Sequence, residues 1–191
     1  MPDFMSRIIS SKLLFFFFSA IFFVHLQVGR NFKPHYDCKI TKMISLNLPS
    51  YQIKISGNAE KPTIWDILRR RFVALTPEEW VRQHFVHYLI EHLGYPTALM
   101  ANETRLSIGG KQLRADTVVY DHSLHPRVII EYKAPTVRLS QKVFDQISTY
   151  NMLMHVDYLM VSNGLQHYCC KMDYENQKYL FIENIPCYNN L

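Results

Sequence analysis

The sequence predicts one α/β domain in which helices flank a mixed β-sheet. Two stretches, residues 76–94 and 140–155, have the apolar spacing of amphipathic helices. The segments between and after them are short runs rich in Val, Ile, Tyr and Leu, separated by turn residues, as strands are. In chain order the elements are a helix, three strands, a helix, a strand and a C-terminal hairpin. This order favours a mixed sheet with helices on its faces.

The first 42 residues differ in composition from the rest of the chain. Residues 13–29 contain no Lys, Arg, Asp or Glu. They fit a signal-peptide core, a short membrane span or, if translation starts at Met43, upstream sequence read in frame. We therefore predict a hydrophobic leader or mis-assigned upstream segment over residues 1–42 and a single domain over residues 43–191. The expected compartment is the cytoplasm, with membrane anchoring as the alternative if residues 13–29 are a genuine translated segment.

Net charge, nucleotide-binding motifs and cysteine spacing each bear on the class of protein. The net charge is +5, but residues 1–42 hold six Lys and Arg against two Asp and Glu, which leaves 15 against 14 in the remainder. The overall charge is therefore no argument for nucleic-acid binding. The chain has neither a Gly-x4-Gly-Lys-Ser/Thr loop nor a Gly-x-Gly-x-x-Gly motif, so we expect it to bind no nucleotide cofactor. The four cysteines form no Cys-x-x-Cys pair, which favours a reducing compartment.

The region before the first helix is the least clearly patterned. Residues 51–55 alternate like an edge strand, and residues 57–62 are predicted to form a loop. Residues 64–75 are compatible with either a helix or a strand. The three consecutive arginines at 69–71 are interpreted as a solvated face.

Residues 76–94 give the clearest helix. Thr76 is the predicted N-cap, Pro77 suits the first turn, and Glu79 completes a Thr-x-x-Glu capping box. Gly94 ends the helix. Capping gives Glu79 a sufficient structural role, and a second role as an acidic group near a metal is kept as an alternative. Three histidines on this helix are interpreted as surface residues rather than as a metal cluster: His84, His87 and His92.

The strands and the second helix follow after the first helix. The predicted elements are strands at 97–108, 112–120 and 127–133, a helix at 140–155, a strand at 158–162 and a hairpin of 167–172 with 178–182. Gly109-Gly110 is predicted to turn the chain between the first two strands, and residues 121–126 link the next two as a hairpin.

That central hairpin carries the candidate chemistry. Because strand side chains alternate between faces, Glu131 and Lys133 share one face, and pairing of the hairpin can bring Asp116 beside Glu131. Two adjacent carboxylates repel each other and favour a cation between them, for which Mg²⁺ is the natural candidate. Lys133 adds a positive charge toward the same phosphate or helps to deprotonate an attacking water. This is phosphodiester hydrolysis chemistry. The alternative is an ordinary exposed ion pair on a solvated sheet face.

Two polar residues of the second helix share one face. Gln146 and Tyr150 are four residues apart, so their side chains lie one turn apart on the same side. Hydrogen bonding along the helix surface and aromatic packing account for them without any further function.

These elements in this order resemble a known family. The strand with Ala115-Asp116, the strand with Glu131-x-Lys133 and the helix with Gln146-x-x-x-Tyr150 are similar to the PD-(D/E)XK nuclease superfamily, and within it to the N-terminal nuclease domain of type I restriction enzyme R subunits. The similarity covers residues 44–188. It implies a restriction-endonuclease-like fold with a helix-strand-strand-strand-helix-strand core and a C-terminal hairpin. Ala115 departs from the proline in the superfamily name.

The resemblance also implies roles for individual residues. Asp116 and Glu131 would bind Mg²⁺ with the backbone carbonyl of Tyr132, and Lys133 would support the attacking water and the scissile phosphate. Gln146 and Tyr150 would take part in DNA handling, and Glu79 would be the acidic residue of the first helix.

The expected function is that of a Mg²⁺-dependent DNA endonuclease of restriction or defence type. Its expected partners are DNA and separately encoded restriction-system subunits or a motor, since the chain contains no motor of its own. The alternative is a non-cleaving DNA-binding or complex-assembly module on the same scaffold.

Overall fold

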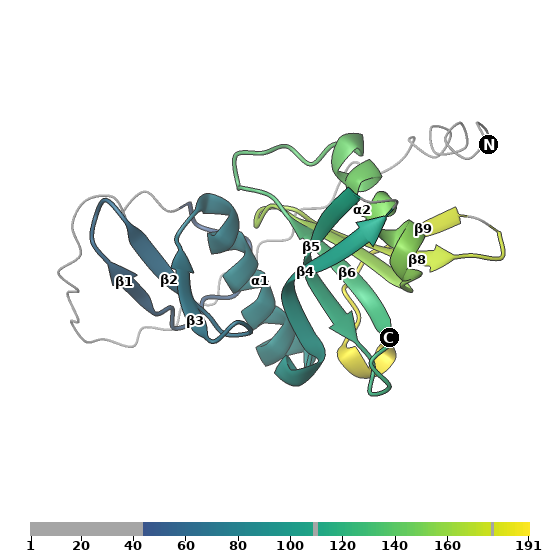
Figure 1. Ribbon diagram of the computed structural model, residues 1–191, viewed down its shortest axis with the longest axis horizontal. Helices are drawn as coiled ribbons and strands as arrows, with labels where there is room; N and C mark the ends of the chain where they lie inside the picture. Colours follow the sequence, from purple (N-terminus) through teal and green to yellow (C-terminus); the bar gives the residue numbers. More distant parts are fainter. Residues whose placement is uncertain (1–43, 109–110, 177) are drawn as a thin grey trace. The chain divides into compact units, whose positions relative to one another are not determined.

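The computed structural model describes residues 44–108, 111–176 and 178–191 (Figure 1). The predictions for residues 1–42 and for the Gly109-Gly110 turn lie outside the described residues. Within the described part, no helix has the length and apolar content that crossing a bilayer requires.

A six-stranded mixed sheet forms the centre of the fold. Its strands are β4 (Met100–Ile108), β5 (Lys111–Tyr120), β6 (Pro126–Tyr132), β7 (Tyr158–Ser162), β8 (His167–Asp173) and β9 (Lys178–Ile182). They lie side by side in chain order, with β6 and β7 parallel and all other neighbours antiparallel. The predicted mixed sheet and its C-terminal hairpin are confirmed. The first strand was predicted to begin at residue 97, but residues Thr97–Leu99 form the short 3-10 helix η3. A second one, η4, covers Tyr188–Asn190.

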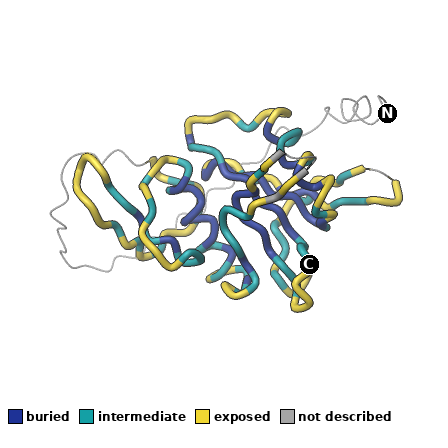
Figure 2. Tube along the Cα trace, in the orientation of Figure 1, coloured by how far each residue is buried: buried dark blue, intermediate teal, exposed yellow. Residues whose placement is uncertain are grey.

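The two helices cover opposite faces of this sheet. Helix α1 spans Pro77–Leu93 and α2 spans Gln141–Met154. Because neighbouring residues of a strand point to opposite faces, Ile130 of β6 packs in the core with α1, whereas Ile129 packs in the core with α2. Figure 2 shows that burial concentrates in the central strands and the sheet-facing sides of the helices. From α1 onward the predicted element order is therefore confirmed, and so are the helices on the faces of the sheet.

The ends of α1 follow the sequence prediction with one difference. Thr76 Oγ1 accepts a hydrogen bond from Glu79 N at 3.0 Å, and Gly94 takes a left-handed conformation with φ of 70°. The return half of the capping box is absent from this end of the helix, because the Glu79 carboxylate instead accepts bonds from Arg69 and Gln83. Glu79 therefore does more than cap its own helix.

The region before α1 forms a separate three-stranded antiparallel sheet, which the sequence did not predict. Its strands are β1 (Ile55–Gly57), β2 (Pro62–Asp66) and β3 (Arg71–Ala74). The strand predicted at 51–55 was wrong, since β1 begins where that strand was to end. The predicted loop at 57–62 is confined to residues 58–61.

A turn decides between helix and strand for residues 64–75. Asp66 Oδ1 accepts hydrogen bonds from the backbone N–H groups of Leu68 and Arg69, both at 2.8 Å, which reverses the chain between β2 and β3. The helical alternative is therefore wrong. Of the three arginines predicted to form a solvated face, Arg70 and Arg71 are exposed, but Arg69 is half-buried in an ion pair with Asp66.

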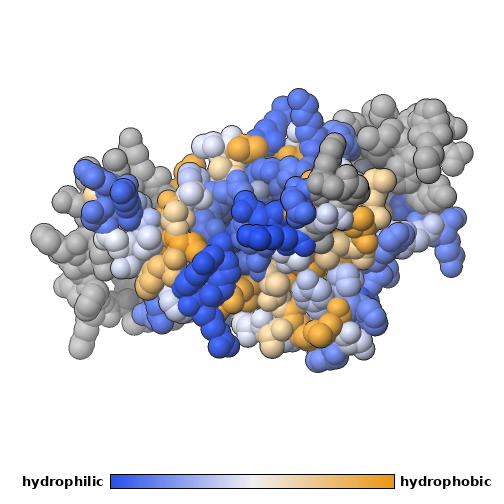
Figure 3. All heavy atoms as spheres, viewed as in Figure 1, coloured by the Kyte–Doolittle hydropathy of each residue, from blue (hydrophilic) through white to orange (hydrophobic). Residues whose placement is uncertain are grey.

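The hairpin of the edge strand β4 and its neighbour β5 carries exposed charged side chains. Arg105 of β4 and Arg114 of β5 are exposed. Figure 3 shows a strongly hydrophilic area over the β4–β5 hairpin on the face in view. Charged side chains on an edge strand disfavour pairing with a strand of another molecule.

Candidate active site

The carboxylates of Asp116 and Glu131 meet at the end of the β5–β6 ladder. Thr117 pairs with Ile130 in this antiparallel ladder, so the next pair in register is Asp116 opposite Glu131. Directly opposite residues point to the same face of a sheet. Asp116 Oδ2 also accepts a hydrogen bond from Tyr132 N at 2.9 Å, which ties the aspartate to β6. The sequence prediction that the hairpin brings these residues together is confirmed.

Both carboxylates are buried. Asp116 is 7% exposed and Glu131 is 3% exposed. The alternative of an exposed ion pair on a solvated sheet face is therefore wrong. Burying two acids side by side disfavours their ionised forms.

The pKa values of the two acids reflect this environment. Burial and the charge of Asp116 raise the pKa of Glu131 to about 7, although the hydrogen bond from Lys133 opposes the shift. Burial also raises the pKa of Asp116, against the opposing charge of Arg82 and the hydrogen bond from Tyr132 N. A cation that binds Glu131 therefore displaces the proton that this carboxyl keeps up to about pH 7.

Lys133 completes the predicted set of three residues. Its Nζ lies 2.7 Å from Glu131 Oε1 and 3.3 Å from Gln146 Oε1. Burial disfavours the charge of Lys133, but the hydrogen bond to Glu131 and the charges of the surrounding acids together outweigh it, and the pKa of Lys133 is raised. The lysine therefore carries a positive charge beside the two acids at neutral pH.

Helix α2 brings its two polar residues to the same place. Gln146 Nε2 donates to Glu131 Oε1 at 2.6 Å and to the Tyr150 hydroxyl at 3.0 Å. Hydrogen bonding along the helix, the simpler interpretation of Gln146 and Tyr150, is thus present, and the same amide also reaches the acid pair. Gln146 and Tyr150 therefore belong to one hydrogen-bonded network with Glu131 and Lys133.

Glu79 lies next to this network rather than in it. Its Oε1 accepts bonds from Arg69 Nη2 and Gln83 Nε2, both at 2.8 Å, and its Oε2 lies 3.2 Å from Arg82 Nη1. The neighbouring Glu78 was not anticipated. Its pKa is raised by burial and by the charge of Asp116, which puts Glu78 within electrostatic range of the acid pair.

Arg82 and Glu103 are the main additions that sequence reasoning missed. Arg82 is 3% exposed, and its Nη2 lies 2.8 Å from Asp116 Oδ1 while its Nη1 lies 2.5 Å from Glu103 Oε1. The signal for Arg82 was its place beside the apolar stripe of α1, where a charged side chain needs a buried partner. Glu103 gave no signal before the register of β4 on β5 was known.

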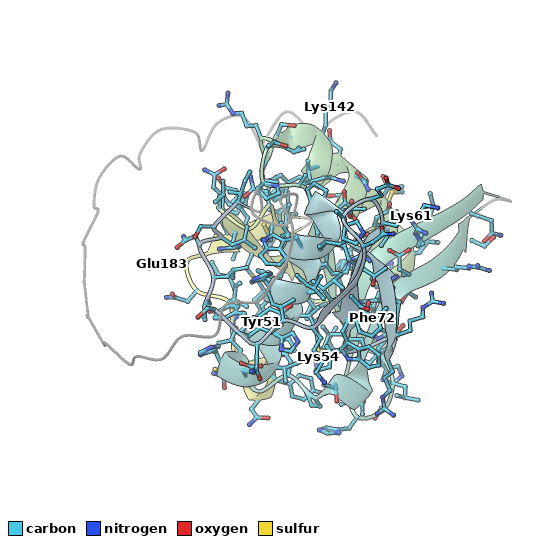
Figure 4. All side chains as sticks on the ribbon, turned by 90° about the vertical axis from the view of Figure 1, so that its left-hand side faces the viewer. Tyr51, Lys54, Lys61, Phe72, Lys142 and Glu183 are labelled. Carbon is cyan, nitrogen blue, oxygen red and sulfur yellow. The ribbon has the colours of Figure 1, made fainter. Side chains whose placement is uncertain are left out.

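The prediction that the three histidines of α1 lie on the surface is confirmed for His92, which is exposed, but not for His84 and His87. His84 is buried and not on the surface, because its ring packs against Tyr51 and Trp80 and its Nδ1 lies 2.8 Å from Trp80 O. His87 is half-buried and stacks on Tyr51 with 3.7 Å between the ring centroids. Figure 4 shows Tyr51 on the side of the molecule that carries β1.

The donor set at the acid pair suits a hard divalent ion. Glu131 Oε2 is buried and accepts no hydrogen bond from the described residues, so one carboxylate oxygen has its lone pairs free. In the described part of the chain, no three His, Cys, Asp or Glu side chains form a group able to hold a metal. The ligands at hand are two carboxylates and backbone carbonyls, and Mg²⁺ typically takes one or two carboxylates and completes its shell with water and phosphate.

A mixed sheet covered by helices on both faces, with two acids and a lysine at the end of a hairpin, defines a protein of restriction-endonuclease-like fold. The model of the family described as type I restriction enzyme R protein N terminus matches residues 77–186. This span includes every candidate site residue and more than half of the chain. The chain belongs to this family.

One solved structure adds a distant similarity. It is a fragment described as the HsdR subunit of a type I restriction enzyme from Vibrio vulnificus YJ016, with 16% sequence identity and a TM-score of 0.45. The similarity covers 59% of this chain and 24% of that chain, so the present chain spans about a quarter of the length of the structure it matches. No curated protein matches the sequence.

Proposed function

We propose that this protein is a Mg²⁺-dependent DNA endonuclease of restriction or defence type, which hydrolyses phosphodiester bonds at Asp116, Glu131 and Lys133. The observation that supports the proposal best is the buried acid pair with a free carboxylate oxygen, Glu131 Oε2, and a charged lysine 2.7 Å from the other oxygen of Glu131. Family membership supports a restriction context.

Asp116 and Glu131 would hold the ion, together with the backbone carbonyl of Tyr132. The chemistry that Mg²⁺ supplies at such a site is activation of a water and neutralisation of the charge that develops on phosphate oxygens. The buried acids bind a cation more strongly than exposed acids do, because water does not screen them.

Lys133 acts through its charge. Since its pKa is raised, Nζ keeps its proton, and the ammonium stabilises the negative charge on the scissile phosphate rather than removing a proton from water. Gln146 orients the Glu131 carboxylate from α2, and Tyr150 orients Gln146 in turn. The proposal includes DNA handling by Gln146 and Tyr150, because both belong to the hydrogen-bonded network of Glu131.

The proposed partners are DNA and separately encoded subunits or a motor of a restriction system, with no nucleotide bound by this chain. A motor would deliver DNA to the site, whereas the chemistry needs only the residues named above.

Cleavage of plasmid DNA by the full chain tests the proposal. Supercoiled plasmid is incubated with Mg²⁺ and the wild-type protein, Asp116→Asn, Lys133→Ala or Lys142→Ala. Lys142 lies in the first turn of α2, is exposed and extends away from the protein, so it is a matched control for Lys133 (Figure 4). We expect nicking by the wild type and Lys142→Ala, and its loss in the other two variants and in EDTA. Equal nicking by all four proteins would refute the assignment.

A non-cleaving DNA-binding or assembly module is the second candidate. The observation that favours it is that the protein's own cations already balance the acids, since Arg82 lies against Asp116 and Lys133 against Glu131. Such a module would bind DNA with an affinity that falls as salt concentration rises, and Asp116→Asn would bind as well as the wild type. DNA binding without any Mg²⁺-dependent nicking would select this candidate.

A further inference from the structure

Three acids lie in one row across the strands β4, β5 and β6. Asn102 pairs with Thr117 and Thr104 with Ala115, so Glu103 is in register with Asp116, which in turn is opposite Glu131. Three basic side chains contact the row, and Arg114 of β5 is one of them, through Glu103. Lys133 binds Glu131, and Arg82 of α1 lies between Asp116 and Glu103.

Arg82 divides its guanidinium among three acids. Its Nη2 is 2.8 Å from Asp116 Oδ1, and its Nη1 is 2.5 Å from Glu103 Oε1 and 3.2 Å from Glu79 Oε2. Its Nε is buried and has no hydrogen-bond acceptor within the described part of the chain. The guanidinium is thus surrounded by negative charge, yet one of its donors has no partner.

Glu103 adopts an unusual backbone conformation to reach this position. Its φ is 60°, in the left-handed region that costs a side-chain-bearing residue free energy. The strain is offset by two ion pairs, because Glu103 Oε2 lies 2.6 Å from Arg114 Nη1 and Oε1 faces Arg82. In this conformation Glu103 places a third acid against Arg82.

We propose that Arg82 is the resident counter-ion of Asp116 and that the divalent cation competes with it, while Glu103 and Glu79 retain the guanidinium when the metal takes Asp116. The inference rests on the proposed function, because it requires a metal at Asp116. Arg82 is a positioning residue in this scheme, and it sets how tightly the metal binds. Glu103 acts through Arg82, because its carboxylate remains an ion-pair partner for the guanidinium when Asp116 binds the metal.

The scheme makes opposite predictions for two neighbouring residues. Arg82→Gln removes the competing charge, so the dissociation constant for the metal falls, by about tenfold for a charge in contact with a ligand. Glu103→Gln leaves Arg82 with fewer partners other than Asp116, so the metal binds more weakly. In the double variant the Glu103 substitution loses most of its effect, because Glu103 has no guanidinium left to hold.

Calorimetric titration of the full chain with Mn²⁺ as the probe tests this scheme. Asp116→Asn defines the site, and Arg105→Gln is the control for losing an exposed arginine of β4 two residues from Glu103. The expected order of affinity is Arg82→Gln above the wild type and the control, and Glu103→Gln below them. Unchanged or weaker binding by Arg82→Gln, or additive effects in the double variant, would overturn the inference.

The outcomes also separate this inference from the proposed function. Mn²⁺ binding that does not depend on Asp116 contradicts the proposed function and this inference with it. Binding that depends on Asp116 but not on Arg82 and Glu103 overturns the inference alone. Should Arg82→Gln fail to fold, Glu103→Gln decides by itself, since an unchanged affinity in that variant is incompatible with the scheme.

Discussion

Gln146 Nε2 donates a hydrogen bond to Glu131 Oε1 across 2.6 Å, which connects the middle of α2 to the end of β6. The same carboxylate oxygen accepts the bond from Lys133 Nζ. Because Oε1 is held from two elements, Oε2 is left as the free oxygen of Glu131. The orientation of Glu131, the proposed metal ligand, is therefore set in part by Gln146 of the helix that covers this face of the sheet.

Loss of this hydrogen bond should slow cleavage. For Gln146→Ala we expect a rate of plasmid nicking about 10- to 100-fold below that of the wild type, the usual cost of removing a residue that orients a metal ligand. Single-turnover nicking at saturating Mg²⁺ measures this effect. Gln141→Ala, which removes an exposed amide from the first turn of the same helix, should nick at the wild-type rate. A Gln146→Ala rate equal to that of Gln141→Ala would contradict the positioning role.

The raised pKa of Glu131 predicts how stability depends on pH. In the unfolded chain this carboxyl releases its proton near the ordinary pKa of 4.5, whereas in the folded protein it keeps the proton up to about pH 7. Between these values the folded state binds more protons, so the metal-free protein loses stability as pH rises.

Thermal unfolding in EDTA measures this dependence from about pH 5 to pH 8. The unfolding temperature of the wild type should fall over this range. Glu131→Gln cannot ionise, and its profile should be flatter and lie above that of the wild type at high pH. Parallel profiles for the two proteins would show that Glu131 is not the group responsible.

Lys133→Met should separate chemistry from metal binding. We expect a nicking rate about 100- to 1000-fold lower, because a charge that faces the transition state is lost. The affinity for Mn²⁺ should not fall, because a positive charge beside Glu131 is removed at the same time. Lys142→Met serves as the exposed control. Loss of Mn²⁺ binding in Lys133→Met alone would argue for a structural role instead.

The N-cap of α1 gives a prediction about stability alone. Thr76→Ala removes the acceptor for Glu79 N and should lower the free energy of unfolding by about 1 kcal/mol. Urea denaturation followed by circular dichroism measures the loss. Thr149→Ala, which removes a threonine hydroxyl bonded to a carbonyl of its own helix on the exposed side of α2, should cost less. Equal losses would mean that the Thr76 cap contributes nothing specific.

Local sequence patterns were sufficient for much of the candidate site. Strand alternation put Glu131 and Lys133 on one face, and the short link between the two strands made Asp116 their neighbour. Both depend on residues close in the chain, so spacing alone predicted them. The helix period did the same for Gln146 and Tyr150, which lie one turn apart. Helix α1 was equally predictable from the sequence, because an N-cap threonine and a glycine mark its ends.

Patterns failed where the outcome depended on distant segments. The hairpin of β2 and β3 was ambiguous because its sequence suits helix and strand, and only the turn at Asp66 and the pairing of the strands decided it. His84 looked like a surface residue until Tyr51, 33 positions earlier, packed against it.

The sequence by itself determined the order of the elements and the two acids and lysine of the central hairpin, because these follow from periodicity and a short turn. Only the tertiary structure decided that the acids are buried and that Arg82 forms ion pairs with both Asp116 and Glu103. The physical reason is that ionic partners are chosen by the register of β4 on β5 and the docking of α1 on the sheet. Neither of these is encoded in the spacing of any single segment.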